Sequence, residues 1–292
     1  MIFLAALLVD GALTGAIYAL IALSFVIVYK ASRMINFAVG ECVVLASRLV
    51  ALGTHGLGLG VAGGLAVGCA GMVAVMLGFN EAVLRHLAGR PVIALLMITI
   101  GLATLIRGAT ALLLGGVPSG IMALPPPIVV AGVPIAIEKA VAAVIAVVCI
   151  GSASWALQRS RTGVALRAIA DDQQSAMAVG IDLHRYFGLT WALAGVISVV
   201  AGTLWTVVAG GGFGMALLGL KIFPIVIIGG LDSIGGTLVG AVLVGVLEAL
   251  AAGYVDPLLG GGFSNIASYL VLLTLLFVRP YGLFGRPDAR RV

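Results

Sequence analysis

Apolar runs of membrane-crossing length recur along the chain and constrain its fold more than any other feature. Examples are residues 2–29, 91–114, 136–157 and 187–209, and a helix needs about 20 predominantly apolar residues to cross the hydrocarbon core. Only 9% of the 292 residues are charged, against about 25% in a soluble domain. A β-barrel would show short alternating segments instead. The sequence therefore predicts an all-α polytopic transmembrane helical bundle that forms one domain over residues 1–292.

The longest polar interval, residues 159–186, is the main exception to this pattern. Loops rich in arginine stay on the cytoplasmic side of a membrane, and apolar residues interspersed with charges predict a short helix over 163–179 that ends at Gly180. Two roles remain open for the interval, a docking surface for a cytoplasmic partner and a solvated connector. Its arginines are Arg159, Arg161, Arg167 and Arg185.

The other basic residues extend this orientation to the whole chain. They predict about nine crossings of the cell's inner membrane, within a range of about eight to ten, with the N-terminus outside and the C-terminus in the cytoplasm. Lys139 then lies outside, and Arg48, Arg107 and Lys221 lie near or within spans. Twelve of the 16 lysines and arginines fall on the inner face, namely Lys30, Arg33, Arg85, Arg90, Arg159, Arg161, Arg167, Arg185, Arg279, Arg286, Arg290 and Arg291.

Glycines spaced four apart predict where helices pack closely, because small residues let two helix backbones approach within a membrane. Gly11 and Gly15 lie in the first span, expected at about 11–29 after a short leading segment. A second ridge follows the first, and it consists of Gly60, Gly64 and Gly68.

A later apolar run holds several helix-breaking residues and predicts a discontinuous helix pair. Pro224 removes a backbone donor in the middle of the run. Two glycine pairs, Gly229–Gly230 and Gly235–Gly236, flank Asp232 and Ser233, and either polar residue can cap the following helix. Irregular backbone at membrane depth is tolerated where it lines a cavity, as in transporters.

Polar groups also interrupt the second apolar run, which contains Asn36, Glu41 and Arg48. Glu41 and Arg48 are two helical turns apart, about 10 Å along the axis, which is too far for a direct ion pair. Charges at this depth usually face the bundle interior or a wet cavity. Two interpretations of Glu41 stay open: it lines a pathway, or it lies at the cytoplasmic mouth, stabilised by the helix N-terminus.

Signals for catalysis, cofactors, metals and nucleic acid are missing from the sequence. His55, His86 and His184 lie in different loops, and three scattered cysteines suggest neither a disulfide framework nor a metal site. No phosphate-binding GxxxxGK[ST] motif occurs. We therefore expect no enzyme activity and no cofactor in this chain, and an ATP-driven process would need a separate subunit to bind the nucleotide.

Three motifs resemble the permease subunit of branched-chain amino acid ABC importers, the Liv type, over nearly the whole chain. They are GALTGAIYALIALSFVIVYKASRMINFAVGE at 11–41, TGVALRAIADDQQSAMAVGID at 162–182 and GLKIFPIVIIGGLDSIGGTLVGAVLVGVLE at 219–248. The family commonly has His where this chain has Val39, a departure that bears on substrate or on packing.

The resemblance implies a half of a translocation pathway, with a second homologous permease, two cytoplasmic ATPases and an extracytoplasmic solute-binding protein as partners. It implies branched-chain or related amino acids as substrates, with urea or small carboxylates as the alternative. The polar groups of the first motif, Tyr18, Asn36 and Glu41, are then pathway candidates. The 162–182 motif resembles the ATPase-contacting loop, and its coupling candidates are Arg167, Ala168, Asp171, Asp172 and Gly180.

A secondary transporter coupled to an ion gradient is the main alternative class. It would need buried ionisable groups, for which Glu41, Arg107, Lys221 and Glu248 are available. A membrane-embedded enzyme would need convergent His, Asp or Ser groups, and the spacing of these residues shows none.

Cysteine labelling tests the predicted orientation. In intact cells, Gln173→Cys and Asp288→Cys should be shielded from an impermeant thiol reagent, whereas Pro126→Cys should react, because only the last position is expected outside. Labelling of Gln173→Cys from the outside would overturn the orientation.

Overall fold

The computed structural model describes residues 2–86, 92–118, 120–121, 127–130, 133–212, 215, 217–279 and 282–285. Several residues used in the sequence-based predictions lie outside these ranges. They are Arg90, Pro126, Arg286, Asp288, Arg290 and Arg291.

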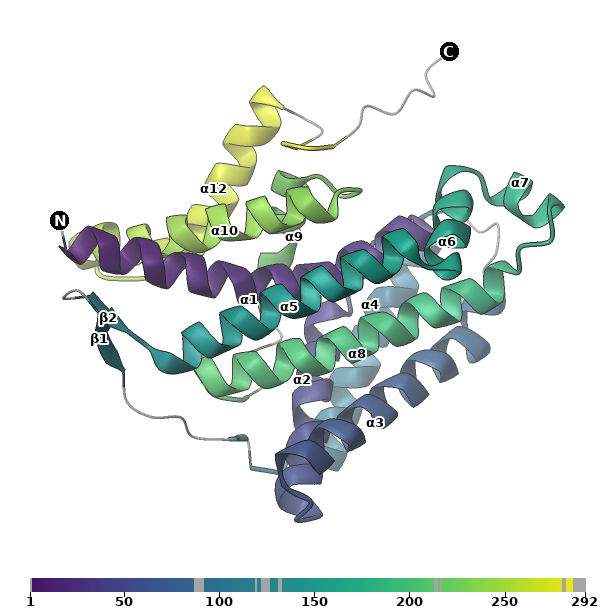
Figure 1. Ribbon diagram of the computed structural model, residues 1–292, viewed down its shortest axis with the longest axis horizontal. Helices are drawn as coiled ribbons and strands as arrows, with labels where there is room; N and C mark the ends of the chain where they lie inside the picture. The colour runs from purple at the N-terminus through teal and green to yellow at the C-terminus, as the bar shows by residue number, and fades with distance from the viewer. Residues whose placement is uncertain are drawn as a thin grey trace. The chain divides into compact units, whose positions relative to one another are not determined.

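Helices make up almost all of the described structure, which confirms the all-α prediction (Figure 1). A two-stranded antiparallel hairpin, β1 (Ile128–Val130) and β2 (Val133–Ile135), precedes α5. Short π-helical segments follow α2 at Leu52–Gly56 and α10 at Ala251–Val255. The helices are α1 (Ile2–Ser32), α2 (Val39–Ala51), α3 (Gly60–Ala82), α4 (Val92–Leu114), α5 (Ile137–Arg159), α6 (Arg161–Asp171), α7 (Gln173–Ala178), α8 (Leu183–Ala209), α9 (Leu217–Gly229), α10 (Ile234–Leu250), α11 (Asp256–Leu259) and α12 (Phe263–Val278).

Six helical segments of the described chain are long and apolar enough to cross a membrane. Two shorter apolar helices, α9 and α12, accompany them. The count of eight to ten crossings therefore stays a prediction, since it depends on whether these shorter helices and α2 also cross. The six long segments are Ile2–Ser32, Gly60–Ala82, Ile93–Leu114, Ile137–Arg159, Leu183–Ala209 and Ile234–Leu259.

The chain divides into two compact units, and one of them, Leu23–Ala123 with Cys149–Leu220, is built around α2. This short helix contacts α3, α4 and α8, and 12 of its 13 residues are buried. Trp191 of α8 packs against Phe79 of α3, with ring centroids 5.1 Å apart. A helix so enclosed cannot place a charged residue without a partner inside the protein.

Glycines bring the helices of this unit into backbone contact. A Cβ added at Gly202 of α8 would lie 2.5 Å from the Val43 carbonyl oxygen of α2, and one at Gly68 of α3 would lie 2.6 Å from Val50 Cγ2. Gly64 also packs against α2 residues, so two members of the predicted ridge are confirmed. Gly60 was wrongly included: it begins α3 at a φ of +69° with open space around it.

The other unit, Met1–Ala22 with Leu124–Val148 and Lys221–Val292, contains the contact between α1 and α10. A Cβ added at Gly11 would lie 2.6 Å from Val246 Cα, and one at Gly15 would lie 2.7 Å from Val242 Cα. This confirms the close approach that the glycine spacing predicted.

The predicted boundary between a leading segment and the first span is wrong, because α1 is continuous from Ile2 to Ser32. The reason lies in the contacts of the residues at that point. Lys139 binds the Asp10 carboxylate at 2.6 and 2.8 Å, and Thr14 Oγ1 donates to the Asp10 carbonyl at 2.9 Å. Asp10 is therefore accommodated within the helix.

The predicted discontinuous pair is a tight hairpin of α9 and α10 within this unit. Gly229 and Gly236 touch through their backbones, and a Cβ added at Gly240 would lie 2.6 Å from the Ile225 carbonyl oxygen. Gly230 turns the chain at a φ of +101°, and Ser233 accepts a hydrogen bond from the Gly236 N–H at 2.9 Å, capping α10. The helix α9 continues through Pro224.

Two carbonyls at the end of α9, which lack intrahelical partners, receive donors from a distant part of the chain. Leu283 N–H donates to the Ile228 carbonyl at 2.8 Å, and Phe284 N–H donates to the Gly229 carbonyl at 3.2 Å. These bonds satisfy groups that the end of a helix leaves unpaired, so the short segment 282–285 stabilises the hairpin.

A pair of glycine substitutions tests the α1–α10 contact. Gly15→Ala should lower the melting temperature of the purified protein by several degrees, because the new methyl group meets backbone atoms that cannot move aside. Gly151→Ala is the matched control, since its Cβ would have no neighbour within 4 Å and alanine favours a helix. Equal melting temperatures for the two variants would contradict the contact.

Candidate functional site

An ion pair between an enclosed carboxylate and an exposed guanidinium joins α2 to α4 in the unit built around α2. Glu41 lies in the first turn of α2 with 5% of its side chain exposed. Arg107 of α4 donates from Nε to Glu41 Oε1 at 2.7 Å, and its Nη2 donates to the same oxygen. Arg48 instead donates to the Val117 carbonyl at 2.6 Å. Glu41 and Arg48 therefore form no direct ion pair, and this confirms the prediction from their spacing.

Asn36 organises the turn that leads into α2. Its Oδ1 accepts a hydrogen bond from the Ala38 N–H at 2.9 Å. Thr99 of α4 donates to the Ile35 carbonyl at 3.2 Å and accepts from the Phe37 N–H at 3.3 Å. The turn is thus tied to α4 just before the position of Glu41, and these contacts place Asn36 and Glu41 in the same unit.

Tyr18 belongs to the other unit, where it contacts a second ion pair. Its hydroxyl donates to Glu248 Oε2 of α10 at 2.8 Å, and Lys221 Nζ of α9 donates to the same oxygen at 3.3 Å. Glu248 Oε1 is buried without a hydrogen-bond partner among the described residues. Tyr18 and its partners therefore belong to a different unit from Asn36 and Glu41.

Sequence reasoning missed both pairings, although a signal was available. Arg107, Lys221 and Glu248 were recognised as charges inside apolar runs, and such charges usually pair with one another. The partner of each charge could not be read from spacing, because Arg107 lies 66 positions from Glu41.

The polar interval between α5 and α8 contains two helices, so the prediction of one helix over 163–179 is wrong. Asp172 interrupts it with extended backbone at φ −155° and ψ 110° and caps α7 by accepting from the Gln174 N–H at 2.9 Å. Ser160 caps α6, and Asp182 caps α8. Gly180 has a φ of +87°, which agrees with the predicted stop.

Burial separates the faces of α6 and α7. Leu166, Ile169 and Ala176 are buried within the chain, so they are unavailable to a partner. Arg167 donates to the Leu157 carbonyl at 2.8 Å, which places its charge at the end of α5. Ala168 is half-buried and Asp171 is exposed. The large apolar residues left exposed are Val164, Met177 and Val179.

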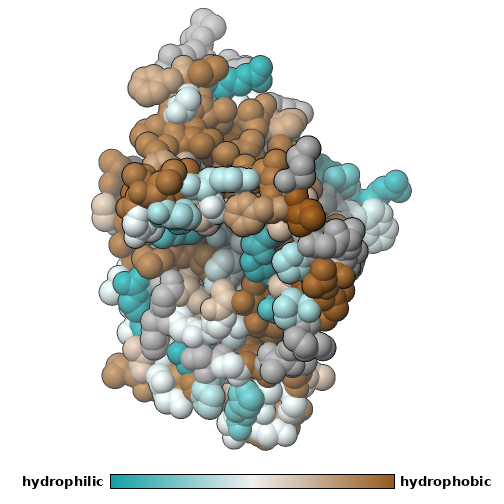
Figure 2. All heavy atoms as spheres, turned by 90° about the vertical axis from the view of Figure 1, so that its left-hand side faces the viewer, coloured by the Kyte–Doolittle hydropathy of each residue, from teal (hydrophilic) through white to brown (hydrophobic). Residues whose placement is uncertain are grey.

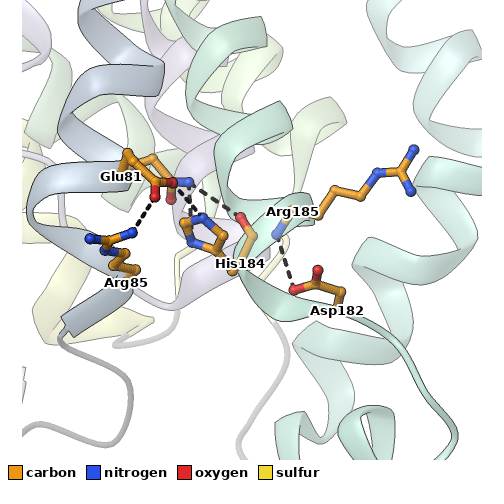
Figure 3. A network of polar contacts seen from close by, with 6 residues as sticks. Glu81, Arg85, Asp182, His184 and Arg185 are labelled. Carbon is orange, nitrogen blue, oxygen red and sulfur yellow. Dashed lines mark hydrogen bonds and ion pairs between the residues drawn. The ribbon is translucent and has the colours of Figure 1, made fainter.

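A polar network fixes the point at which this interval rejoins the transmembrane helices (Figure 3). Glu81 of α3 pairs with Arg85 and lies 2.8 Å from His184 Nε2 at the start of α8. Asn80 Nδ2 donates to the His184 carbonyl at 3.3 Å. The Arg185 side chain points away from Glu81 in this view. The network links α3 and α8 next to the Asp182 cap.

The surface of the protein is suited to an apolar environment. Hydrophobic atoms cover broad areas of the face in Figure 2, especially in its upper part. Exposed large side chains on α4 and α5 include Leu112, Leu113 and Val148. Within the part of the chain that the structure describes, no three His, Cys, Asp or Glu residues lie together as metal ligands would.

The family described as "Branched-chain amino acid transport system / permease component" matches residues 7–279. The chain belongs to this family of permease components. The match includes both ion pairs and the α6–α7 interval.

Curated relatives agree with this assignment of the permease component. The high-affinity branched-chain amino acid transport system permease protein BraD of Pseudomonas aeruginosa is 29% identical, over 98% of this chain and 97% of the relative. The corresponding LivH protein of Escherichia coli K12 is 28% identical, over 97% of this chain and 96% of the relative. A probable LivH protein of Methanocaldococcus jannaschii is 32% identical over 44% of this chain. No solved structure matches the chain significantly.

Proposed function

We propose that this protein is the transmembrane permease subunit of an ATP-driven ABC importer and forms half of a translocation pathway for branched-chain or related amino acids. The family match over residues 7–279 carries this proposal. The described chain supplies membrane-length helices, and its sequence contains no phosphate-binding loop. The energy must therefore enter through another subunit.

The partners follow from this role. A second homologous permease completes the pathway, two cytoplasmic ATPases supply the energy, and an extracytoplasmic binding protein delivers the solute. The chain acts as a single domain in the inner membrane, with its N-terminus outside and its C-terminus in the cytoplasm. The excess of arginine in residues 159–186 supports this orientation.

The pathway assignment rests on the polar residues within the apolar segments. Glu41, Asn36 and Tyr18 are assigned to it because each is a buried polar group in or beside a predicted span. The α9–α10 hairpin is assigned to the moving part of the pathway. Its break at Gly230 and its cap at Ser233 give it irregular backbone, which membrane proteins tolerate beside cavities. The hairpin residues concerned are Pro224, Gly229, Gly230, Asp232 and Ser233.

Uptake by the reconstituted complex tests the proposed function. Proteoliposomes that contain both permeases, the ATPases and the binding protein should take up leucine only when ATP is present in the compartment that the ATPases face. An ionophore should not abolish this uptake. Uptake without ATP that collapses with the ionophore would identify a secondary transporter. ATP-dependent uptake of urea or a small carboxylate, without amino acid uptake, would identify the other solute class.

The α6–α7 interval is assigned to coupling with the ATPases. Capped, packed helices transmit a displacement as a body, and Ser160, Asp172 and Asp182 provide the caps. Exposed Val164, Met177 and Val179 can fill an apolar groove of a partner. Asp171 and half-buried Ala168 lie beside them, while Arg167, Asp172 and Gly180 hold the shape of the interval from within.

Charge insertion tests the coupling assignment. Val164→Glu and Ala168→Glu should reduce ATPase retention by about tenfold, because each brings a carboxylate to an apolar interface. Gly180→Val should act less strongly, through backbone strain. Retention is measured by co-purification of the ATPases with the detergent-solubilised permease.

Leu258→Glu is the matched control, because Leu258 is 82% exposed and lies outside the interval. Unchanged ATPase retention and hydrolysis in both Val164→Glu and Ala168→Glu would remove the interval from the interface. The docking site would then be sought at residues 80–90.

A further inference from the structure

Arg107 occupies an unusual position for a membrane protein. It lies in the interior of α4, yet 65% of its side chain is exposed. Ile100, Thr104 and Ala111 are also exposed, and their spacing of seven, three and four positions from Arg107 puts them on the same helix face. A guanidinium in contact with lipid tails would be strongly unfavourable. At membrane depth such a group usually faces the interior of the helix bundle or a water-filled cavity.

The ion pair with Glu41 leaves hydrogen-bonding capacity on both partners. Both donor nitrogens of Arg107 that reach Glu41 converge on Oε1. Among the described residues, no hydrogen bond reaches Glu41 Oε2 or leaves Arg107 Nη1. A guanidinium has five N–H donors, and a carboxylate has two acceptor oxygens. Arg107 can thus accept a ligand without first losing its contact with Glu41, whereas a ligand reaches Glu41 only through the 5% of its side chain that is exposed.

Opposite charges side by side match one chemical class of ligand. An α-amino acid carries a carboxylate and an ammonium group on the same carbon. The planar guanidinium binds carboxylates through parallel hydrogen bonds, and a carboxylate accepts hydrogen bonds from an ammonium group. A small carboxylate would use only Arg107, and urea has no net charge for either partner.

We propose that Arg107 and Glu41 together bind the zwitterionic head of an amino acid in the pathway, Arg107 through the carboxylate and Glu41 through the ammonium group. This inference rests on the proposed function. Ile100 and Ala111 on the same face suit an aliphatic side chain. In the absence of substrate the two residues neutralise each other, which keeps the enclosed Glu41 charge from being left uncompensated.

Binding of three probes to the complete complex in nanodiscs tests the assignment. The probes are L-leucine, 4-methylpentanoate, which lacks the ammonium group, and 3-methylbutylamine, which lacks the carboxylate. Saturation-transfer NMR without the binding protein measures each affinity. Arg107→Gln should lower the affinities for leucine and 4-methylpentanoate by at least about tenfold and leave the affinity for 3-methylbutylamine unchanged. Glu41→Gln should lower the affinities for leucine and 3-methylbutylamine and leave the affinity for 4-methylpentanoate unchanged.

A matched control is a second Arg–Glu pair of the same unit among the residues that the structure describes. Glu81→Gln and Arg85→Gln remove charges from an exposed pair on α3 and should leave all three affinities unchanged. Retention of the ATPases shows that each variant is folded. If Glu41→Gln or Arg107→Gln prevents assembly, the double variant Glu41→Gln/Arg107→Gln, which preserves side-chain shape, is measured instead and should bind leucine at least about tenfold more weakly.

Either of two results would overturn the assignment: equal changes for all three probes, which indicate a structural pair, or wild-type affinities in the variants. A wild-type complex that transports leucine but binds none of the probes would also overturn it. The failure of the proposed function has a different signature, because the wild-type complex would then show no ATP-dependent leucine uptake at all.

Discussion

Backbone contact between helices at glycine is the interaction on which the rest of this structure depends. In a bilayer the hydrophobic effect does not drive helices together, so van der Waals packing between close surfaces must hold them. Gly15 brings α1 onto α10, Gly202 brings α8 onto α2, and Gly229 meets Gly236 within the α9–α10 hairpin. Larger side chains at these points would separate the helices. The polar side chains that these helices carry would then no longer meet.

Close packing also explains how charges are tolerated within each unit. Enclosing α2 removes Glu41 and Arg48 from water, and the protein compensates with Arg107 and the Val117 carbonyl. In the other unit Glu248 is enclosed and forms an ion pair with Lys221. Breaking such a pair leaves an uncompensated buried charge, which is strongly destabilising. The four ionisable groups that could have served an ion-coupled transporter are therefore held as two pairs, and pairing alone accounts for their stability.

The α6–α7 interval follows a different physical rule, because polar side chains within it cap the ends of its helices. Three polar caps, Ser160, Asp172 and Asp182, define where its helices begin. Part of its apolar surface is used to pack against the chain, and the remainder, including Met177 and Val179, stays exposed. An interval built in this way keeps its shape and leaves apolar surface exposed, as the proposed coupling to the ATPases would need.

The sequence by itself determined the features that depend on neighbouring residues. The length of the apolar runs predicted a helical membrane protein, the spacing of Gly11 and Gly15 predicted a close helix contact, and Gly180 predicted the end of a helix. These predictions succeed because solvent preference, steric size and φ are local properties of the residues. Only the tertiary structure decided that Arg107 forms an ion pair with Glu41, because this contact depends on how α2 and α4 pack. It also decided that Asp172 caps a new helix: the sequence pattern around this aspartate permits either one longer helix or an N-cap, and the fold selects the cap by holding the Asp172 backbone extended.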